Sequence, residues 1–261
     1  MQSENSKTTI LSQLALGQLL ASRSEDPKTE QISAIIDEAI VKKNAAQPRR
    51  AYIGASSLGE QCSRKIQYRY LNIPIDEDKG FSARTLRIFS LGHVIEDEMA
   101  KYIRMAGFDL RTEDKDGKQF GFSVANGEIA GHIDGVICGG PAAISYPCLW
   151  ESKSANSKKF GEFVRVGVAK ANPTYAAQIA IYQAYMDLTE NPALFTVFNK
   201  DSSEIYYELV PFDAELAQRV SDKAVNILTA SKANDMLPRV AQNQDFYLCK
   251  MCEFQQTCWK D

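Results

Sequence analysis

The residues of this chain that are best suited to chemistry form two groups, one of cysteines and one of carboxylates with a lysine. Cys249, Cys252 and Cys258 make a C-x2-C-x5-C run near the C-terminus. This spacing is typical of metal or iron–sulfur ligation, but an all-cysteine site needs four thiolates. Cys62 is able to supply the fourth. In a cytosolic protein such spacing favours metal or cluster binding over disulfides.

The second group contains the carboxylates of Asp134 and Glu151 and the amine of Lys153. Glu151 and Lys153 lie two residues apart in a predicted strand over 148–154, so alternation puts both side chains on one face. Asp134 lies in the preceding predicted strand, 128–138, and hairpin-like pairing would bring it alongside. A carboxylate pair suits Mg²⁺ or Mn²⁺, which polarises a scissile phosphate. A neighbouring lysine offsets charge in the transition state.

Two histidines and two residues of a later helix extend this group. His93 lies on a predicted helix over 83–106, and an imidazole facing the sheet would be a further ligand with a preference for Mn²⁺. His132 lies on the strand of the first carboxylate, where we favour a structural role over a supporting role at the metal. Gln178 and Tyr182 lie four residues apart on a predicted helix, so their side chains project together.

The elements that must position these residues change from helical to strand patterning and back. Apolar residues recur at helical spacing in the first 50 residues and around 83–106, then at strand spacing until about 154. Ser56-Ser57 is a helix-capping signal that predicts a helix over 58–71, with Cys62 in its first turns. The predicted helices are 8–22, 30–44, 58–71, 83–106, 157–167, 173–189 and 213–234. The predicted strands are 108–112, 119–125, 128–138, 148–154, 194–200 and 204–210.

This order predicts an α/β fold with a mixed central sheet flanked by helices. We expect a helical N-terminal extension over 1–50 and a second domain over 51–261 that ends in the cysteine-rich tail. The 261 residues carry 44% hydrophobic residues and a net charge of −3, so no overall basic surface suggests a protein that coats DNA. Local basic contacts at a nuclease site remain compatible with this charge. No segment is apolar for long enough to span a membrane, and we expect a cytoplasmic protein.

Taken in order, the motifs resemble the RecB-like branch of the PD-(D/E)XK nuclease superfamily. The resemblance covers about residues 52–258. It rests on Gly92-His93, Gly131-His-Ile-Asp134-Gly, Glu151-Ser-Lys153 and Gln178-x3-Tyr182. The cysteine set resembles the iron–sulfur version of this branch, found in CRISPR-associated RecB-like exonucleases, AddB-type nuclease domains and phage relatives. The implied core is restriction-endonuclease-like and is closed by the cysteine-rich tail.

The resemblance implies a role for each matching residue. The metal ligands would be His93, Asp134, Glu151 and the backbone carbonyl of Ser152. Lys153 would be the catalytic lysine beside the two carboxylates. Gln178 and Tyr182 would hold the substrate strand and the geometry of the site. The four cysteines would bind a structural 4Fe–4S cluster, with zinc as the competing occupant. The implied reaction is hydrolysis of DNA that is single-stranded or has a free end, with Mg²⁺ or Mn²⁺.

The sequence leaves the wider setting of this activity open. A P-loop is absent, so a helicase or recombinase would be a separate partner, and a homo-oligomer is compatible with the motifs. DNA recombination, repair and CRISPR-type processing all fit, in a bacterial or phage-infected cell. The alternatives are a catalytically silent nucleic-acid-binding subunit of a recombination complex, an RNA or structure-specific endonuclease, and a structural protein built on a zinc site. The motifs do not explain the N-terminal extension.

Overall fold

A computed structural model describes residues 26–260, so the helix expected at 8–22 lies outside the described part. Its packing divides the chain into two units. Within the described part, the first unit contains residues 26–48 and 81–88, and the second contains 49–80 and 89–260. The first unit is built on α2 (Pro27–Ala45), whose N-terminus is capped by the Asp26 carboxylate. All the candidate site residues belong to the second unit.

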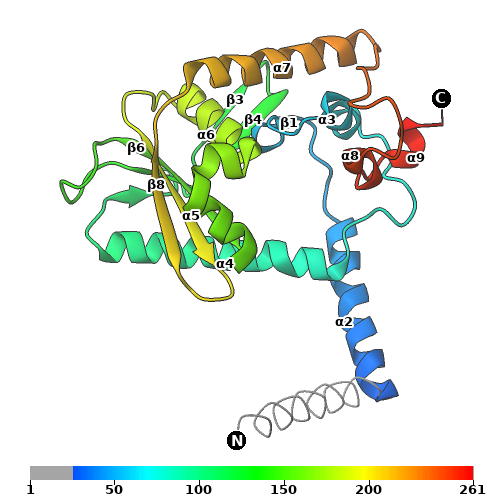
Figure 1. The fold of residues 1–261 in the computed structure, drawn as a ribbon, viewed down its shortest axis with the longest axis horizontal. Helices are drawn as coiled ribbons and strands as arrows, with labels where there is room; N and C mark the ends of the chain where they lie inside the picture. Colours follow the sequence, from blue (N-terminus) through cyan, green and yellow to red (C-terminus); the bar gives the residue numbers. More distant parts are fainter. Residues whose placement is uncertain (1–25, 261) are drawn as a thin grey trace, which may run out of the picture. The chain divides into compact units, whose positions relative to one another are not determined.

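The larger sheet of the second unit is mixed and has the strand order β2-β5-β6-β7-β8 (Figure 1). Its central strand β6 runs parallel to β7, whereas the other neighbouring strands are antiparallel. The five strands are β2 (Leu110–Arg111), β5 (Gly135–Ile137), β6 (Cys148–Ala155), β7 (Ala193–Asn199) and β8 (Ile205–Val210). The expected mixed α/β architecture is therefore confirmed.

The strand expected over 128–138 is in fact two strands in two different sheets. β4 (Ile129–His132) lies between β1 (Ile53–Gly54) and β3 (Gly121–Val124) in a small sheet, whereas β5 belongs to the larger one. Between them, the amide of Ile133 donates to the carbonyl of Phe120 at 3.0 Å, and the next residue, Asp134, leaves the ladder. Residue periodicity cannot reveal such a break, because both halves are apolar and strand-like.

Helices cover both faces of the larger sheet. The part of α4 (Ala83–Met105) that belongs to the second unit packs against one face, where Met99 and Trp150 are buried in one cluster. On the other face, α5 (Ser157–Ala171) and α6 (Pro173–Tyr185) pack on Leu149 and Phe195. The side chains of consecutive β6 residues thus pack into hydrophobic clusters on opposite faces of the sheet, as strand alternation requires. α7 (Ala214–Lys232) packs against α6.

The helix expected over 58–71 begins later than the capping signal suggested. The Ser57 hydroxyl donates to the carbonyl of Gly54 within a 3-10 turn, η1 (Ala55–Ser57), so it caps no α-helix. α3 (Ser63–Tyr70) starts only after Cys62, which is its N-cap residue. The tail contains two short helices that sequence periodicity missed, α8 (Tyr247–Lys250) and α9 (Gln255–Cys258). Across residues 26–260, no helix combines the length and apolarity needed to cross a bilayer.

Candidate active site and cysteine pocket

Glu151 and Lys153 project from β6 toward α6, on one face as expected. The Glu151 side chain is fully buried, and its Oε1 accepts hydrogen bonds from Lys153 Nζ and, at 2.7 Å, from Gln178 Nε2. Its other oxygen, Oε2, is buried and has no hydrogen-bond partner among the described residues. An unpaired buried carboxylate oxygen is costly, so it calls for a ligand at this position.

Asp134 lies beside this strand at an edge that β5 leaves open. β5 pairs with β6 only as far as Trp150, and Asp134 Oδ2 accepts the amide proton of Ser152 at 2.8 Å. In a strand, the N–H and C=O of one residue point to the same side. The carbonyl of Ser152 therefore points toward the same edge as Asp134. The prediction that Asp134 lies within a strand was wrong, because β4 ends before it and β5 begins after it. The pairing of Gly135 with Trp150 still brings Asp134 beside Glu151, as expected.

Glu96 is a further acidic residue of this site, and it is not among the residues predicted from the sequence. Burial, and after it the negative charge of Asp134, raises the pKa of Glu96 to about 7. His93, one turn earlier on α4, has a side chain that is 82% exposed, and its Nδ1 lies 3.9 Å from Glu96 Oε2. Periodicity could not single out Glu96, because glutamates on helices are common and mostly solvated. We name Asp134, Glu151, Lys153 and Glu96 the carboxylate site.

The carboxylate site concentrates negative charge away from water. Burial, followed by the charge of Asp134, raises the pKa of Glu151 to about 8, against the opposing effect of Lys153. Burial also raises the pKa of Asp134. Although burial disfavours the charged amine, the Glu151 and Asp134 carboxylates together raise the pKa of Lys153, which therefore stays protonated. A bound cation would relieve the repulsion that remains between the carboxylates.

The donors of the carboxylate site fit a hard divalent cation. They are carboxylate oxygens, one of them unpartnered, and the backbone carbonyl of Ser152. Mg²⁺ usually takes one or two protein carboxylates and completes its shell with waters and substrate phosphates. Among the described residues, no three His, Cys, Asp or Glu side chains are placed so that they could hold a metal ion together.

α6 borders the site through Gln178, Tyr182 and Tyr175. The Lys153 ammonium lies 5.2 Å from the centre of the Tyr175 ring, and burial together with the Glu151 charge raises the pKa of Tyr182. Tyr182 also lines a small pocket of about 100 Å³, together with Arg50 and His132. His132 is exposed at the end of β4 and faces this pocket.

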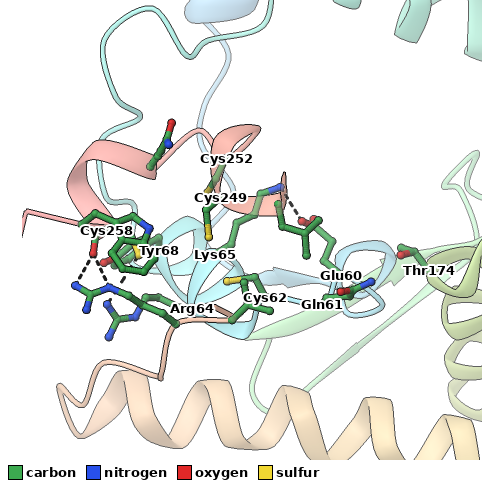
Figure 2. A pocket seen from close by; sticks show the side chains of 15 residues that line it. Glu60, Gln61, Cys62, Arg64, Lys65, Tyr68, Thr174, Cys249, Cys252 and Cys258 are labelled. Carbon is green, nitrogen blue, oxygen red and sulfur yellow. Dashed lines mark hydrogen bonds and ion pairs between the residues drawn. The ribbon is translucent and has the colours of Figure 1, made fainter. Parts of the chain in front are cut away.

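The four cysteines expected to act together line one cavity of about 180 Å³ in the second unit (Figure 2). They come from the N-cap of α3, from α8 and the residue two positions after it, and from the end of α9. Arg64 Nη1 lies 3.9 Å from the Cys258 thiol, and the amide of Phe254 donates to Cys252 Sγ at 3.4 Å. The thiols are not arranged as a metal-binding group among the described residues. We name Cys62, Cys249, Cys252 and Cys258 the cysteine pocket.

Ion pairs and a buried aspartate hold the tail against the remainder of the second unit. Asp76 accepts hydrogen bonds from the amide and hydroxyl of Thr257 at 3.0 and 2.6 Å. Burial opposes ionisation of Asp76, but the hydrogen bonds from Thr257 lower its pKa overall. Arg69 of α3 bridges Glu60 and Glu253, the latter at 2.6 Å. These contacts hold the C-terminal tail against the segment around Cys62.

Comparison with solved structures supports the fold. The structure is similar to LHK-Exo, an alkaline exonuclease from Laribacter hongkongensis, crystallised with dAMP: TM-score 0.51, 15% identity, covering 71% of this chain and 90% of that one. Another crystal structure of LHK-Exo gives a TM-score of 0.49 at 15% identity, with 76% of this chain and 93% of that chain covered. The structure of SSO0001 gives 0.47 at 16% identity, with 87% and 96% covered.

At 15% identity, the likeness to the dAMP complex shows a shared fold. No protein-family profile matches the sequence. No curated protein matches it either.

Proposed function

We propose that this chain is a Mg²⁺- or Mn²⁺-dependent nuclease that hydrolyses phosphodiester bonds in DNA. The observation that carries the proposal is the buried, unpartnered Oε2 of Glu151 beside Asp134 and the protonated Lys153. A buried carboxylate oxygen without a hydrogen-bond partner is typical of a site that binds a cation. The fold shared with an alkaline exonuclease supports the same reaction class.

In this proposal Asp134, Glu151 and the Ser152 carbonyl hold the cation, and His93 and Glu96 contribute from α4. When bound, the cation would supply positive charge to polarise the phosphate and lower the pKa of a water. Lys153, fixed by Glu151 at one end of its side chain, places an ammonium where negative charge develops on the phosphate. Glu96 is able to accept a proton near neutral pH. Gln178 keeps Glu151 in orientation through its hydrogen bond.

The substrate strand would pass the pocket next to Tyr182. Arg50 supplies a cation there, and His132 and the backbone of Gly131 line the same wall. Arg50 also lies over the Tyr52 ring, at 5.9 Å from its centre. A guanidinium beside a small polar cavity suits a backbone phosphate, and phosphate contacts position a strand without reading its sequence. LHK-Exo, for comparison, was crystallised with a nucleotide, dAMP.

The cysteine pocket would hold a 4Fe–4S cluster, with zinc as the alternative. Arg64 supplies a cation at one of its thiols, with Nη1 3.9 Å from Cys258 Sγ. Burial raises the pKa of Cys252, and the charge of Lys65 opposes this shift. The thiols would move into ligand geometry when the centre binds, since metal binding and local folding are coupled.

The test is cleavage of single-stranded DNA labelled at the 5′ or the 3′ end, with Mn²⁺ or EDTA. We expect short products with Mn²⁺ only, and none from Glu151→Ala. A matched control is Glu162→Ala, which removes a partly exposed carboxylate that pairs with Lys159 on α5. DNA binding without cleavage would establish the catalytically silent accessory subunit instead. Cutting of closed circular DNA, or a preference for RNA, would establish the endonuclease alternative.

A further inference from the structure

The segment Leu58–Glu60 is fastened to two helices through three consecutive backbone carbonyls. Lys223 of α7 donates from Nζ to the carbonyl of Leu58 at 2.9 Å and to that of Glu60. The hydroxyl of Thr174 on α6 donates to the carbonyl of Gly59 at 3.2 Å. Burial lowers the pKa of Lys223, so its two bonds to carbonyl oxygens replace lost hydration. The segment is therefore irregular in conformation but fixed in position.

Gly59 brings this segment into direct backbone contact with α6. A Cβ atom on Gly59 would lie 2.6 Å from Thr174 Cα, 2.7 Å from Thr174 O and 3.0 Å from the Ala177 side chain. The first two are backbone atoms, which cannot move aside as a flexible side chain can. The absence of a side chain at position 59 is therefore what allows α6 to sit where it does.

This contact lies between the cysteine pocket and the carboxylate site. On one side, Cys62 follows Glu60 by two residues, and both line the cysteine pocket together with Thr174 (Figure 2). On the other side, Gln178 follows Thr174 by one helical turn and donates to Glu151 at 2.7 Å. A shift of the Cys62 turn would thus be passed to α6 through backbone contact, and from α6 to the Glu151 carboxylate.

We propose that Gly59, Thr174 and Lys223 are positioning residues that couple occupancy of the cysteine pocket to cation affinity at the carboxylate site. This inference rests on the function proposed above for both regions. An uncoupled, purely structural role for the same contacts predicts that changes in the two regions act independently. Coupling predicts that they do not, and the two cases are separable by a double-mutant cycle.

The experiment measures Mn²⁺ binding to the full chain by the electron paramagnetic resonance signal of free Mn²⁺. We expect Cys62→Ala and Gly59→Ala each to weaken binding by about five- to tenfold. The double variant should bind no more weakly than the weaker single variant. Gly59→Ala should keep the iron or zinc content of the wild type. Gly161→Ala is the matched control, because a Cβ there meets nothing within 4 Å. The coupling would be overturned if the two losses of Mn²⁺ affinity multiply in the double variant, or if Gly59→Ala binds Mn²⁺ as tightly as the wild type.

A second pair of variants keeps the inference testable if Gly59→Ala does not fold. Thr174→Val removes the hydroxyl that donates to Gly59 and keeps the shape, whereas Thr174→Ser keeps the hydroxyl. Weaker Mn²⁺ binding in Thr174→Val, restored in Thr174→Ser, would support the coupling, and equal binding in both would overturn it. If Mn²⁺ binding is coupled but the chain does not cleave DNA, the proposed nuclease activity is overturned and the coupling is supported. If the chain cleaves DNA but the effects of the two variants on Mn²⁺ affinity multiply, the nuclease activity is supported and the coupling is overturned. If the wild type does not bind Mn²⁺, both proposals are overturned.

Discussion

The carboxylate site and the cysteine pocket both gather residues that are far apart in the chain, but they are held in different ways. In the carboxylate site the functional groups bind one another: Lys153 and Gln178 donate to Glu151, and Asp134 accepts from the strand that carries it. In the cysteine pocket the thiols are held through their surroundings: Arg64 Nη1 lies 3.9 Å from the Cys258 thiol, and the amide of Phe254 donates to Cys252 Sγ.

The difference follows from the elements that carry the two regions. The carboxylates lie on or beside the central strand β6, which pairs with β7 from Trp150 to Ala155, and on α4, which packs against one face of the sheet. Three of the cysteines lie in or beside helices of four residues, which are too short to be stable without outside contacts. The proposed cation would therefore meet carboxylates already held in place, whereas the proposed cluster would order the thiols as it binds.

The largest expected effect tests whether the carboxylate site is catalytic or only binds a cation. Lys153→Met removes the partly buried ammonium, and we expect DNA cleavage to slow by about 1000-fold, the scale for losing one charge-stabilising group. Mn²⁺ affinity should be retained, because the variant removes a positive charge and no ligand. Lys158→Met, an exposed lysine at the start of α5, is the control. A loss of less than about tenfold would show that Lys153 has no part in the chemistry.

The next effect tests the statement that the cysteine pocket depends on its occupant. Cys249→Ser should lower the free energy of unfolding by about 3 kcal/mol or more, because it removes a ligand that ties the tail to Cys62. Cys148→Ser is a matched control for burial, since both cysteines are buried and Cys148 lies outside the pocket. Cys148→Ser should lower the free energy of unfolding by about 1–2 kcal/mol, because it buries a hydroxyl. Urea unfolding and metal content measure both, and equal losses without loss of metal would contradict the prediction.

The sequence predicted the regular part of this molecule better than its irregular parts. Strand alternation placed Glu151 and Lys153 on one face, and hairpin pairing placed Asp134 beside them, because both depend on local periodicity. The predicted start of α3 at residue 58 was wrong, because the carbonyls of Leu58 and Glu60 are held by Lys223 from α7. A contact over 160 residues of sequence leaves no local signal.

Glu96 and His93 show the same limit within the site. Both residues lie on α4. Histidine is the rarer ligand type, so the sequence predicted His93, and not Glu96, as a ligand. The structure places Glu96 in the field of Asp134 and Lys153, and leaves the His93 side chain 82% exposed. Helical spacing predicts which residues share a face, but it cannot predict which turn of the helix lies over the open edge of β6.

A smaller effect tests whether Glu96 belongs to the cation site. Glu96→Gln keeps the shape of the side chain and removes its charge beside Asp134, so Mn²⁺ affinity should fall by about tenfold. Glu98→Gln is the matched control on the same helix: that side chain is 44% exposed and pairs with Lys101 at 2.6 Å. Titration with Mn²⁺ should show a change of at most about twofold for the control. Equal affinities for the two variants would remove Glu96 from the site.

The last effect is a pH dependence of the carboxylate site. Glu96 and Glu151, with pKa values raised to about 7 and about 8, hold protons that a cation must displace. Mn²⁺ affinity at the carboxylate site should therefore rise by about tenfold between pH 7 and 8 and level off above about pH 9. Because burial raises both pKa values above those of the unfolded chain, the folded state binds more protons. The metal-free protein should then lose stability as pH rises from about 5 to 8. Glu96→Gln should keep only the part of the affinity change due to Glu151, and affinity that is flat across this range would show that neither carboxyl binds the cation.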